Sequence, residues 1–243
     1  MNSEGVALVT GAAGGIGAAV ARRLAEDGFA VACLDLDGDG AAKRAADLDG
    51  ARGFTCDVAD EDSVAGAVAA VRESLGEVTV LVNAAGYFAR HDVPELSVRE
   101  WQHFMNVNAM GPFLMARAVL PAMVAAGAGS IVNVVSTAGV RGGRQRAAYC
   151  ASKGALLQLT RSLSVDHGPQ GVRVNAVCPG LIDTPMADWI RHDATAMAEF
   201  DASLPAGRIG TPQEVADVVS FLVGPSAGYM HGATVMVDGG ISA

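Results

Sequence analysis

The sequence predicts a doubly wound α/β fold, a single sheet of about seven parallel strands flanked by helices on both faces. Short apolar runs rich in valine recur along the chain and alternate with alanine-rich segments. These runs lack the polar alternation of a half-exposed strand, and continuous apolar strands are typical of a parallel sheet covered on both faces. The intervening segments have the length of crossover helices.

The predicted strands follow one another in order, each bounded by polar or turn-forming residues. They lie at residues 6–10, 30–36, 53–58, 78–83, 130–136, 172–178 and 234–238. Segments 15–27 and 60–75 are typical crossover helices. We expect residues 1–243 to form one domain, because α/β folds of this length are commonly single. Residues 181–211 form a long excursion, which we expect to be a substrate lid.

Composition and charge exclude several classes of protein. The chain is 51% hydrophobic and 18% charged, which favours a packed globular domain over disorder. Its net charge of -9 argues against nucleic acid as a partner, since phosphate-backbone binding needs clustered Lys and Arg. The first residues lack the basic and apolar regions of a secretory signal, and no run approaches a membrane span. We expect no membrane partner and a cytoplasmic location.

The sequence offers no convincing metal site. The segment "DLDGDG" (35–40) matches the opening of a calcium loop, but Ala46 stands where a bidentate Glu is needed. The histidines show no paired spacing. The cysteines lack any C-x-x-C pair, and we expect reduced, mainly buried thiols at Cys33, Cys56, Cys150 and Cys178.

A glycine-rich turn, "TGAAGGIG" (10–17), follows the first strand and opens a helical segment. Free N–H groups and the helix dipole at such a turn attract a pyrophosphate, although a glycine-rich chain also produces such clusters as ordinary turns. The spacing G-x-x-x-G-x-G differs from the general dinucleotide motif. The expected cofactor contacts in the turn are Gly11, Gly14, Gly15, Ile16 and Gly17.

Asp35 ends the second predicted strand, close to the position where an acidic residue accepts hydrogen bonds from an adenosine ribose. Its carboxylate would repel the 2′-phosphate of NADP. The order of strand, glycine turn, helix, second strand and carboxylate is typical of a dinucleotide site. The sequence therefore predicts NAD as the cofactor.

Tyr149 and Lys153 in "YCASK" (149–153) lie one helical turn apart and therefore share a face. The ordinary tyrosine pKa is about 10, so a base near neutrality needs its pKa lowered by roughly three units. The Lys153 ammonium supplies part of that effect, and a cationic oxidised nicotinamide supplies more. The pair predicts an acid/base tyrosine coupled to a nicotinamide cofactor.

With these motifs in this order, the sequence resembles the short-chain dehydrogenase/reductase family over essentially its whole length. The resemblance rests on the glycine turn, "CDV" (56–58), "NAAG" (83–86), an active-site Asn and Ser, Y-x-x-x-K and "PG" (179–180). It implies a Rossmann-type oxidoreductase that interconverts a secondary alcohol and a ketone. The cofactor contacts that it implies beyond the turn and Asp35 are Asp57, Val58, Asn83, Ala84, Gly86, Tyr149, Lys153, Pro179, Gly180, Ile182 and Thr184.

The resemblance also completes the catalytic group. Ser136 stands 13 residues before Tyr149, the interval usual in the family, and would orient the substrate oxygen. Asn108, the second Asn of "NVN", is implied to hold a water that links Lys153 to solvent, with Asn106 as its competitor. The predicted catalytic residues are Asn108, Ser136, Tyr149 and Lys153.

The expected substrate wall is largely apolar and suits a cyclic or acyl substrate. Its tentative members are Tyr87, Ala138, Arg144, Leu181, Met186 and Trp189, with Phe88 and Ile190 beside them. The run "RGGRQR" (141–146) adds arginines that pair with a carboxylate or with carrier phosphates, or else form a solvated basic turn. Exposed Arg side chains rarely need a partner, which favours the basic turn.

Two alternative functions share these motifs. An NADPH-dependent 3-oxoacyl-carrier-protein reductase overlaps in its core motifs, but Asp35 and Gly14 weigh against NADPH. A non-catalytic NAD-sensing regulator on the same fold usually loses the tyrosine or the lysine, and both are present here. The apolar helical segments 109–125 and 151–166 lead us to expect a homotetramer.

Overall fold

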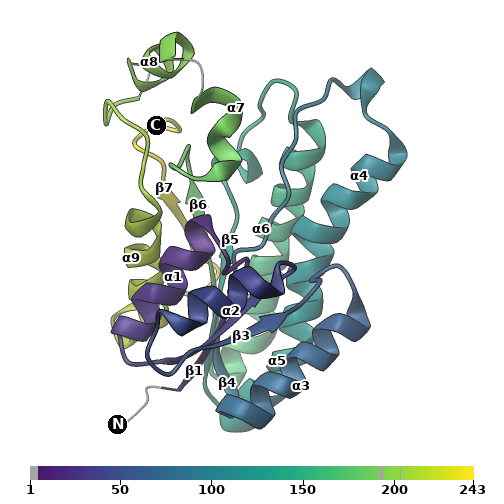
Figure 1. Ribbon diagram of the computed structural model, residues 1–243, viewed down its shortest axis with the longest axis vertical. Helices are drawn as coiled ribbons and strands as arrows, with labels where there is room; N and C mark the ends of the chain where they lie inside the picture. Colours follow the sequence, from purple (N-terminus) through teal and green to yellow (C-terminus); the bar gives the residue numbers. More distant parts are fainter. Residues whose placement is uncertain (1–4, 192–193, 203) are drawn as a thin grey trace.

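The computed structural model describes residues 5–191, 194–202 and 204–243, and a seven-stranded parallel sheet forms the centre of this part of the chain (Figure 1). The spatial order of the strands is β3-β2-β1-β4-β5-β6-β7. The predicted doubly wound sheet is thus confirmed. The strands are β1 (Val6–Thr10), β2 (Ala30–Asp35), β3 (Arg52–Thr55), β4 (Val78–Asn83), β5 (Gly129–Val134), β6 (Val172–Pro179) and β7 (Thr234–Val237).

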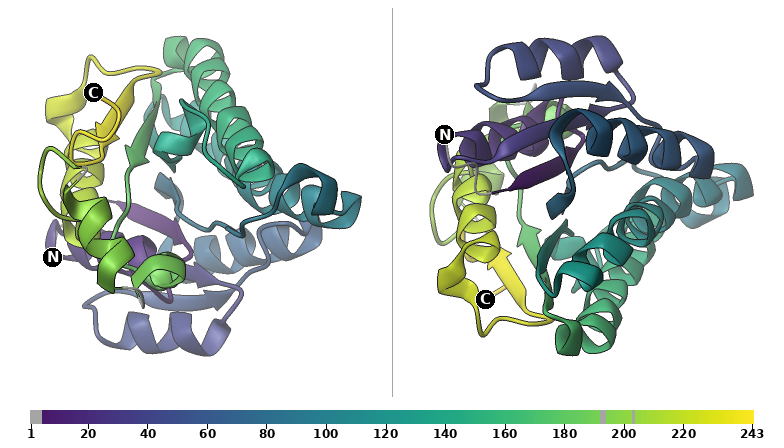
Figure 2. Two further views of the ribbon diagram at one scale, coloured as in Figure 1. Left: turned by 90° about the horizontal axis from the view of Figure 1, so that it is seen from above. Right: turned by 90° about the horizontal axis from the view of Figure 1, so that it is seen from below.

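Helices cover both faces of the sheet (Figure 2). One face carries α1 (Gly15–Glu26) and α9 (Pro212–Val223), and the other carries α3 (Glu61–Leu75), α5 (Gly111–Ala126) and α6 (Ala147–His167). Buried Val, Leu and Ala side chains fill the layers between sheet and helices. The central strands therefore bury both their faces, whereas the edge strands β3 and β7 are more exposed, and this explains why the central strands are largely continuous apolar runs.

The helix α2 (Gly38–Ala46) packs beside β2 and β3 and was not among the predicted elements. The segment that resembles a calcium loop contains its start. Asp37 caps the helix, because its carboxylate Oδ1 accepts a hydrogen bond from the Gly40 backbone N–H at 3.0 Å. The acidic residue thus serves as a helix N-cap.

The helical stretch Val98–Ala126 is long and apolar enough to cross a membrane by length and composition. It comprises α4 (Val98–Met105), a π-helical turn η2 (Asn106–Met110) and α5. Leu114, Met115 and Met123 of α5 are buried in the core against the sheet. Such burial is typical of a core helix in a globular domain.

The predicted lid, residues 181–211, stands above the carboxyl ends of the strands (Figure 1). Its described helices are η5 (Pro185–Ala187), α7 (Asp188–Arg191) and α8 (Ala194–Ala202); residues 192, 193 and 203 lie outside the described residues. Its two ends are joined, because Gly210 N donates to Leu181 O at 3.0 Å and Asp183 N donates to Gly210 O at 2.9 Å. The excursion is therefore a closed loop with a fixed base.

Candidate active site

A cavity of about 340 Å³ lies outside the carboxyl ends of β1, β4, β5 and β6, beneath the lid. This size is typical of small-molecule sites. The cavity also adjoins the change in strand order between β1 and β4, where doubly wound sheets bind ligands. The predicted site residues that line it are Ile16, Ala84, Gly86, Ser136, Ala138, Arg144, Tyr149, Lys153, Pro179, Gly180, Leu181, Ile182, Thr184, Met186 and Trp189.

Tyr149 lies in the first turn of α6, with only 8% of its surface exposed. Burial raises the pKa of Tyr149, whereas a hydrogen bond with the Ser136 side chain and the positive charge of Arg146 act in the opposite direction. The net pKa lies above the ordinary value. The chain by itself therefore does not produce the predicted lowering of this pKa, because the cost of desolvating a phenolate exceeds the effect of its polar neighbours.

Lys153 follows Tyr149 on the same face of α6 and is also buried. Its ammonium Nζ donates to the Val134 carbonyl oxygen at 2.8 Å and lies 6.0 Å from the centre of the Tyr149 ring. Burial lowers the pKa of Lys153 to about 8. The end of β5 thus holds this side chain beside the tyrosine, in the predicted pairing.

Asn108 is fully buried in the π-helical turn between α4 and α5. Its side-chain oxygen accepts from the Tyr87 N–H at 2.8 Å, and its amide nitrogen donates to Tyr87 O at 2.9 Å and to Ser152 Oγ at 3.0 Å. A π-turn widens a helix and is frequent at functional sites. Asn108 therefore fixes the segment after β4 against α6, and it lies behind the residues that line the cavity.

The glycine turn fits a phosphate group at the start of α1. Gly11 and Gly15 have φ values of 69° and 53°, in the left-handed region that favours glycine. A Cβ at Gly17 would lie 2.1 Å from Gly11 O, so only glycine allows this closure. A Cβ at Gly14, by contrast, would meet no heavy atom within 4 Å, and the first helical turn carries no acidic residue. The turn thus offers open space in front of backbone N–H groups, as an anion requires.

Asp35 lies next to this turn. Its carboxylate accepts from the Ala13 N–H at 3.0 Å through Oδ2 and from the Asp37 N–H at 3.0 Å through Oδ1. Each carboxylate oxygen can accept a further hydrogen bond. The position and remaining acceptor capacity of Asp35 fit the ribose hydroxyls of a dinucleotide.

Besides Asp35 and the glycines of the turn, three further predicted cofactor residues lie outside the cavity lining, in segments that follow β3 and end β4. Asp57 Oδ1 accepts from the Ala59 N–H at 2.9 Å, and Val58 is buried in the core. Asn83 donates through its amide to Asn133 Oδ1 at 2.8 Å, which joins the ends of β4 and β5. These contacts shape the loops around the glycine turn.

The loop after β6 faces the glycine turn across the sheet. A Cβ at Gly15 would lie 3.3 Å from the Thr184 methyl carbon. Thr184 and Gly180 also line the cavity. The two loops therefore enclose one site, and the residues expected beside the nicotinamide are brought to the same space as Tyr149.

The placement of Tyr87 in the substrate wall is wrong. Its hydroxyl donates to Glu100 Oε1 at 2.8 Å, and its side chain lines a separate hollow beside α4. The next residue, Phe88, lines the cavity instead, with its ring centre 5.0 Å from that of Tyr149. Successive side chains of an extended segment point to opposite sides, so only one of the two neighbours can face the site.

Two arginines that line the cavity, Arg90 and Arg146, were not among the predicted site residues. Arg90 and Arg146 lie over the ring of Trp189, with guanidinium carbons 4.7 and 5.1 Å from its centre. The run "RGGRQR" drew attention to Arg146, but no sequence signal marks Arg90. Ile241 and Phe200 also line the cavity, and Arg141 donates to the Ile241 carbonyl. The C-terminal segment therefore closes part of its own site.

A family profile described as Enoyl-(Acyl carrier protein) reductase matches residues 11–242, nearly the whole chain. The chain belongs to the short-chain dehydrogenase/reductase family. The predicted family is thus confirmed, and with it a nicotinamide cofactor as the group that the site accommodates. Among the described residues, no three His, Cys, Asp or Glu side chains gather into a metal site.

Members of this family with known activities are similar along their full length. The chain is 43% identical to 2-(R)-hydroxypropyl-CoM dehydrogenase of Xanthobacter autotrophicus, covering 98% of each chain. It is 41% identical to cis-4-hydroxycyclohexanecarboxylate dehydrogenase of Sinomonas cyclohexanicum, covering 99% of this chain and 98% of the relative. These relatives are alcohol dehydrogenases named for small substrates, which agrees with the predicted class of oxidoreductase.

The fold is also that of solved short-chain dehydrogenase/reductase structures. A variant of the actinorhodin polyketide ketoreductase, solved with NADPH, superposes with a TM-score of 0.95 at 38% identity. The match covers 99% of this chain and 97% of that one.

Proposed function

We propose that this protein is an NAD-dependent dehydrogenase that interconverts a secondary alcohol and a ketone on a small substrate with a largely apolar, cyclic or acyl body. The position of Tyr149 carries the proposal. Its phenol lines the cavity together with the Ser136 side chain, which favours the ionised form of the tyrosine, and the Lys153 ammonium lies 6.0 Å from the centre of its ring. An acid/base group, a polar group for the substrate oxygen and a buried cation thus meet at one point.

Each side chain has a role in proton transfer. In the oxidative direction the Tyr149 phenolate takes the hydroxyl proton of the alcohol, and in the reductive direction its phenol returns that proton. Ser136 orients the substrate oxygen and stabilises it as charge develops. Lys153 favours the phenolate through its positive charge. The nicotinamide, when bound, accepts a hydride from the carbinol carbon or returns one to the ketone.

The names of the relatives support a secondary alcohol as substrate. The direct test is nicotinamide absorbance during incubation with cyclic and linear secondary alcohols and the matching ketones, each with NAD and with NADP. The proposal predicts turnover of secondary alcohols with NAD. Turnover with NADPH and acyl-carrier ketones alone would instead identify a 3-oxoacyl-carrier-protein reductase. Tight NADH binding without turnover of any of these compounds would favour a sensor.

We also propose that Asp35 makes the enzyme prefer NAD. The carboxylate stands at the end of β2, next to the open glycine turn, and its charge opposes a 2′-phosphate. Asp35→Ala is therefore expected to narrow the ratio of kcat/KM for NAD to that for NADP by about 10-fold or more. Asp39→Ala removes an exposed carboxylate from the nearby helix α2 and serves as the matched control. An unchanged ratio in Asp35→Ala would refute this assignment.

We also propose that the protein forms a homotetramer and is located in the cytoplasm. Trp101, Met110 and Phe113 leave exposed apolar surface along α4, the π-turn and α5, which suits a subunit interface. A monomer mass in light scattering would refute the assembly. The free cysteines suit a reducing compartment, and cell fractionation tests that location.

A further inference from the structure

Two guanidinium groups share one aromatic ring at the wall of the cavity. Arg90 follows β4, Arg146 immediately precedes α6, and both lie over the indole of Trp189 in the lid, at 4.7 and 5.1 Å. Arg146 also lies 5.7 Å from the centre of the Phe88 ring. Stacking on aromatic faces holds a guanidinium in place while leaving its N–H edges free for an oxyanion.

No carboxylate of the described residues forms an ion pair with either arginine, and the described lining of the cavity contains no acidic side chain. The Arg146 Nε is buried without a hydrogen-bond partner. Arg90 donates to the neutral Gln145 Oε1 at 2.9 Å. Asp92 accepts at 3.2 Å from the amide nitrogen of Gln145. Within the part of the chain that the structure describes, these two adjacent cations therefore have no carboxylate partner, although the net charge of the protein is -9.

The backbone at Gln145, directly before Arg146, is held in a restricted conformation. Gln145 has a φ of 57° and is the one non-glycine residue with a positive φ in the described part of the chain. Its carbonyl accepts from the His91 N–H at 3.0 Å, so the loop before α6 is joined to the segment that carries Arg90. Such conformations persist where the surroundings fix them, and they cluster at ligand sites. The structure thus holds Arg90 and Arg146 side by side.

These arginines share the cavity with the proposed acid/base group. The centre of the Phe88 ring lies 5.7 Å from the guanidinium carbon of Arg146 and 5.0 Å from the centre of the Tyr149 ring. The charge of Arg146 also opposes the rise that burial causes in the pKa of Tyr149. A ligand with a charged end at the arginines would therefore pass along apolar rings before reaching the phenol.

We propose that Arg90 and Arg146 bind the carboxylate, or a similar oxyanion, of a secondary alcohol whose carbinol group reaches Tyr149 along the apolar wall of Phe88 and Trp189. The inference rests on the proposed dehydrogenase function and names the substrate class of that same site. A hydroxylated ring or short chain with an acid at its far end has the required chemistry. Arg144, predicted as a tentative member of the substrate wall, lines the same cavity but is exposed, which suits the alternative of a solvated basic turn.

The test compares two substrates that differ only in charge, cis- or trans-4-hydroxycyclohexanecarboxylate and the corresponding carboxamide. With NAD, the wild-type enzyme is expected to oxidise the acid with a kcat/KM about 10- to 100-fold higher than that of the amide. Arg146→Met and Arg90→Met should each remove most of this preference, and Arg146→Lys should restore part of it. The ratio is the readout, since a change in the pKa of Tyr149 affects both substrates equally.

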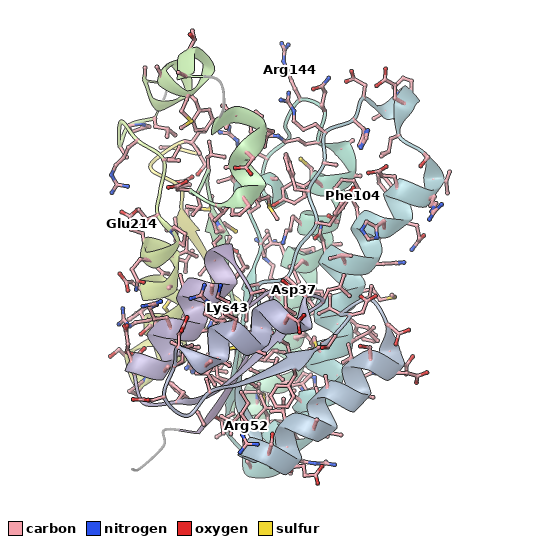
Figure 3. The ribbon with its side chains drawn as sticks, viewed as in Figure 1. Asp37, Lys43, Arg52, Phe104, Arg144 and Glu214 are labelled. Carbon is pink, nitrogen blue, oxygen red and sulfur yellow. The ribbon has the colours of Figure 1, made fainter. Side chains whose placement is uncertain are left out.

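Arg52→Gln provides the matched control. Arg52 is exposed in β3, at the end of the molecule opposite Arg144 and the cavity mouth (Figure 3). The variant removes the same charge and should leave the preference for the acid unchanged. If Arg52→Gln and Arg146→Met lost the preference for the acid equally, the preference would depend on the net charge of the protein alone, and the inference would be overturned.

A binding measurement tests the anion site without relying on turnover. Cyclohexanecarboxylate lacks the hydroxyl, and calorimetric titration of the NADH-loaded enzyme should show binding that weakens at least about 10-fold in Arg146→Met and also weakens with added salt. Equal binding to wild type and variant, or no binding, would overturn the anion site. Equal use of acid and amide by an active enzyme would also overturn it. Absence of turnover with every alcohol would refute the dehydrogenase itself, while the titration still tests the arginines.

Discussion

Lys153 donates its ammonium hydrogen bond to the Val134 carbonyl at 2.8 Å while lying 6.0 Å from the centre of the Tyr149 ring. A backbone carbonyl holds the cation without neutralising it, in contrast to a carboxylate partner. The charge therefore remains available to the phenol. Burial brings the pKa of Lys153 to about 8, so this positive charge is lost as the pH rises through about 8.

The hydrogen bond of Ser136 makes alcohol oxidation pH-dependent in a defined direction. Burial raises the pKa of Tyr149, and the Ser136 hydrogen bond partly offsets that rise by favouring the phenolate. Ser136→Ala should therefore raise this pKa further. Because oxidation needs the phenolate, the increase of kcat/KM with pH should move to higher pH, and kcat should fall about 10²-fold or more. A profile that stays in place or moves to lower pH would contradict this role.

Asn108 is expected to stabilise the fold as well as support the site. Asn108→Ala removes three side-chain hydrogen bonds and leaves the part-buried Tyr87 N–H and C=O without these partners. The expected cost is about 2–4 kcal/mol in the free energy of unfolding, measured by urea denaturation. Asn106→Ala is the control from the same motif. Its side chain accepts one exposed hydrogen bond from Gln102, so its loss should cost less than about 1 kcal/mol. Similar costs for the two variants would contradict the account.

The regular elements of this fold could be predicted from the sequence because both faces of each strand are buried. That burial demands apolar residues at every position, as in β4 and β6, and the pattern is visible without a structure. The start of α2 was missed because Asp37 and its neighbouring glycines resemble a turn, whereas the carboxylate caps a helix. Local chemistry alone did not separate these two outcomes.

The proposed Tyr149–Lys153 pair follows from its spacing, and Ser136 and Asn108 follow from the resemblance to the family, but the substrate wall depends on contacts between distant segments. Arg90 and Arg146 meet at Trp189 only because the lid folds back over the strand ends. The side to which Tyr87 points is likewise set by its contact with Glu100 on α4. No periodicity within one segment encodes such contacts, which is why the cationic end of the cavity became visible only in the fold.

Two glycines of the turn are expected to have different roles: Gly17 is required for folding, whereas Gly14 leaves space for the bound cofactor. Gly17→Ala places a Cβ 2.1 Å from Gly11 O and should destabilise the protein by several kcal/mol or prevent folding, as thermal unfolding would show. Gly14→Ala meets no heavy atom within 4 Å, so it should leave stability within about 1 kcal/mol of wild type. Its methyl group would nevertheless enter the space proposed for the cofactor phosphates. NADH binding should therefore weaken in Gly14→Ala, and an unchanged Kd would place the phosphates elsewhere.

The most direct test of the proposed mechanism is NAD-dependent oxidation of a secondary alcohol by Tyr149→Phe, measured together with its affinity for NADH. The substitution removes the phenolic hydroxyl and keeps the ring that contacts Phe88 at 5.0 Å. The account predicts that kcat falls by at least about 10²-fold while the Kd for NADH stays within about threefold of wild type. Turnover that persists near the wild-type rate would show that another group moves the proton, and would contradict the central role of Tyr149.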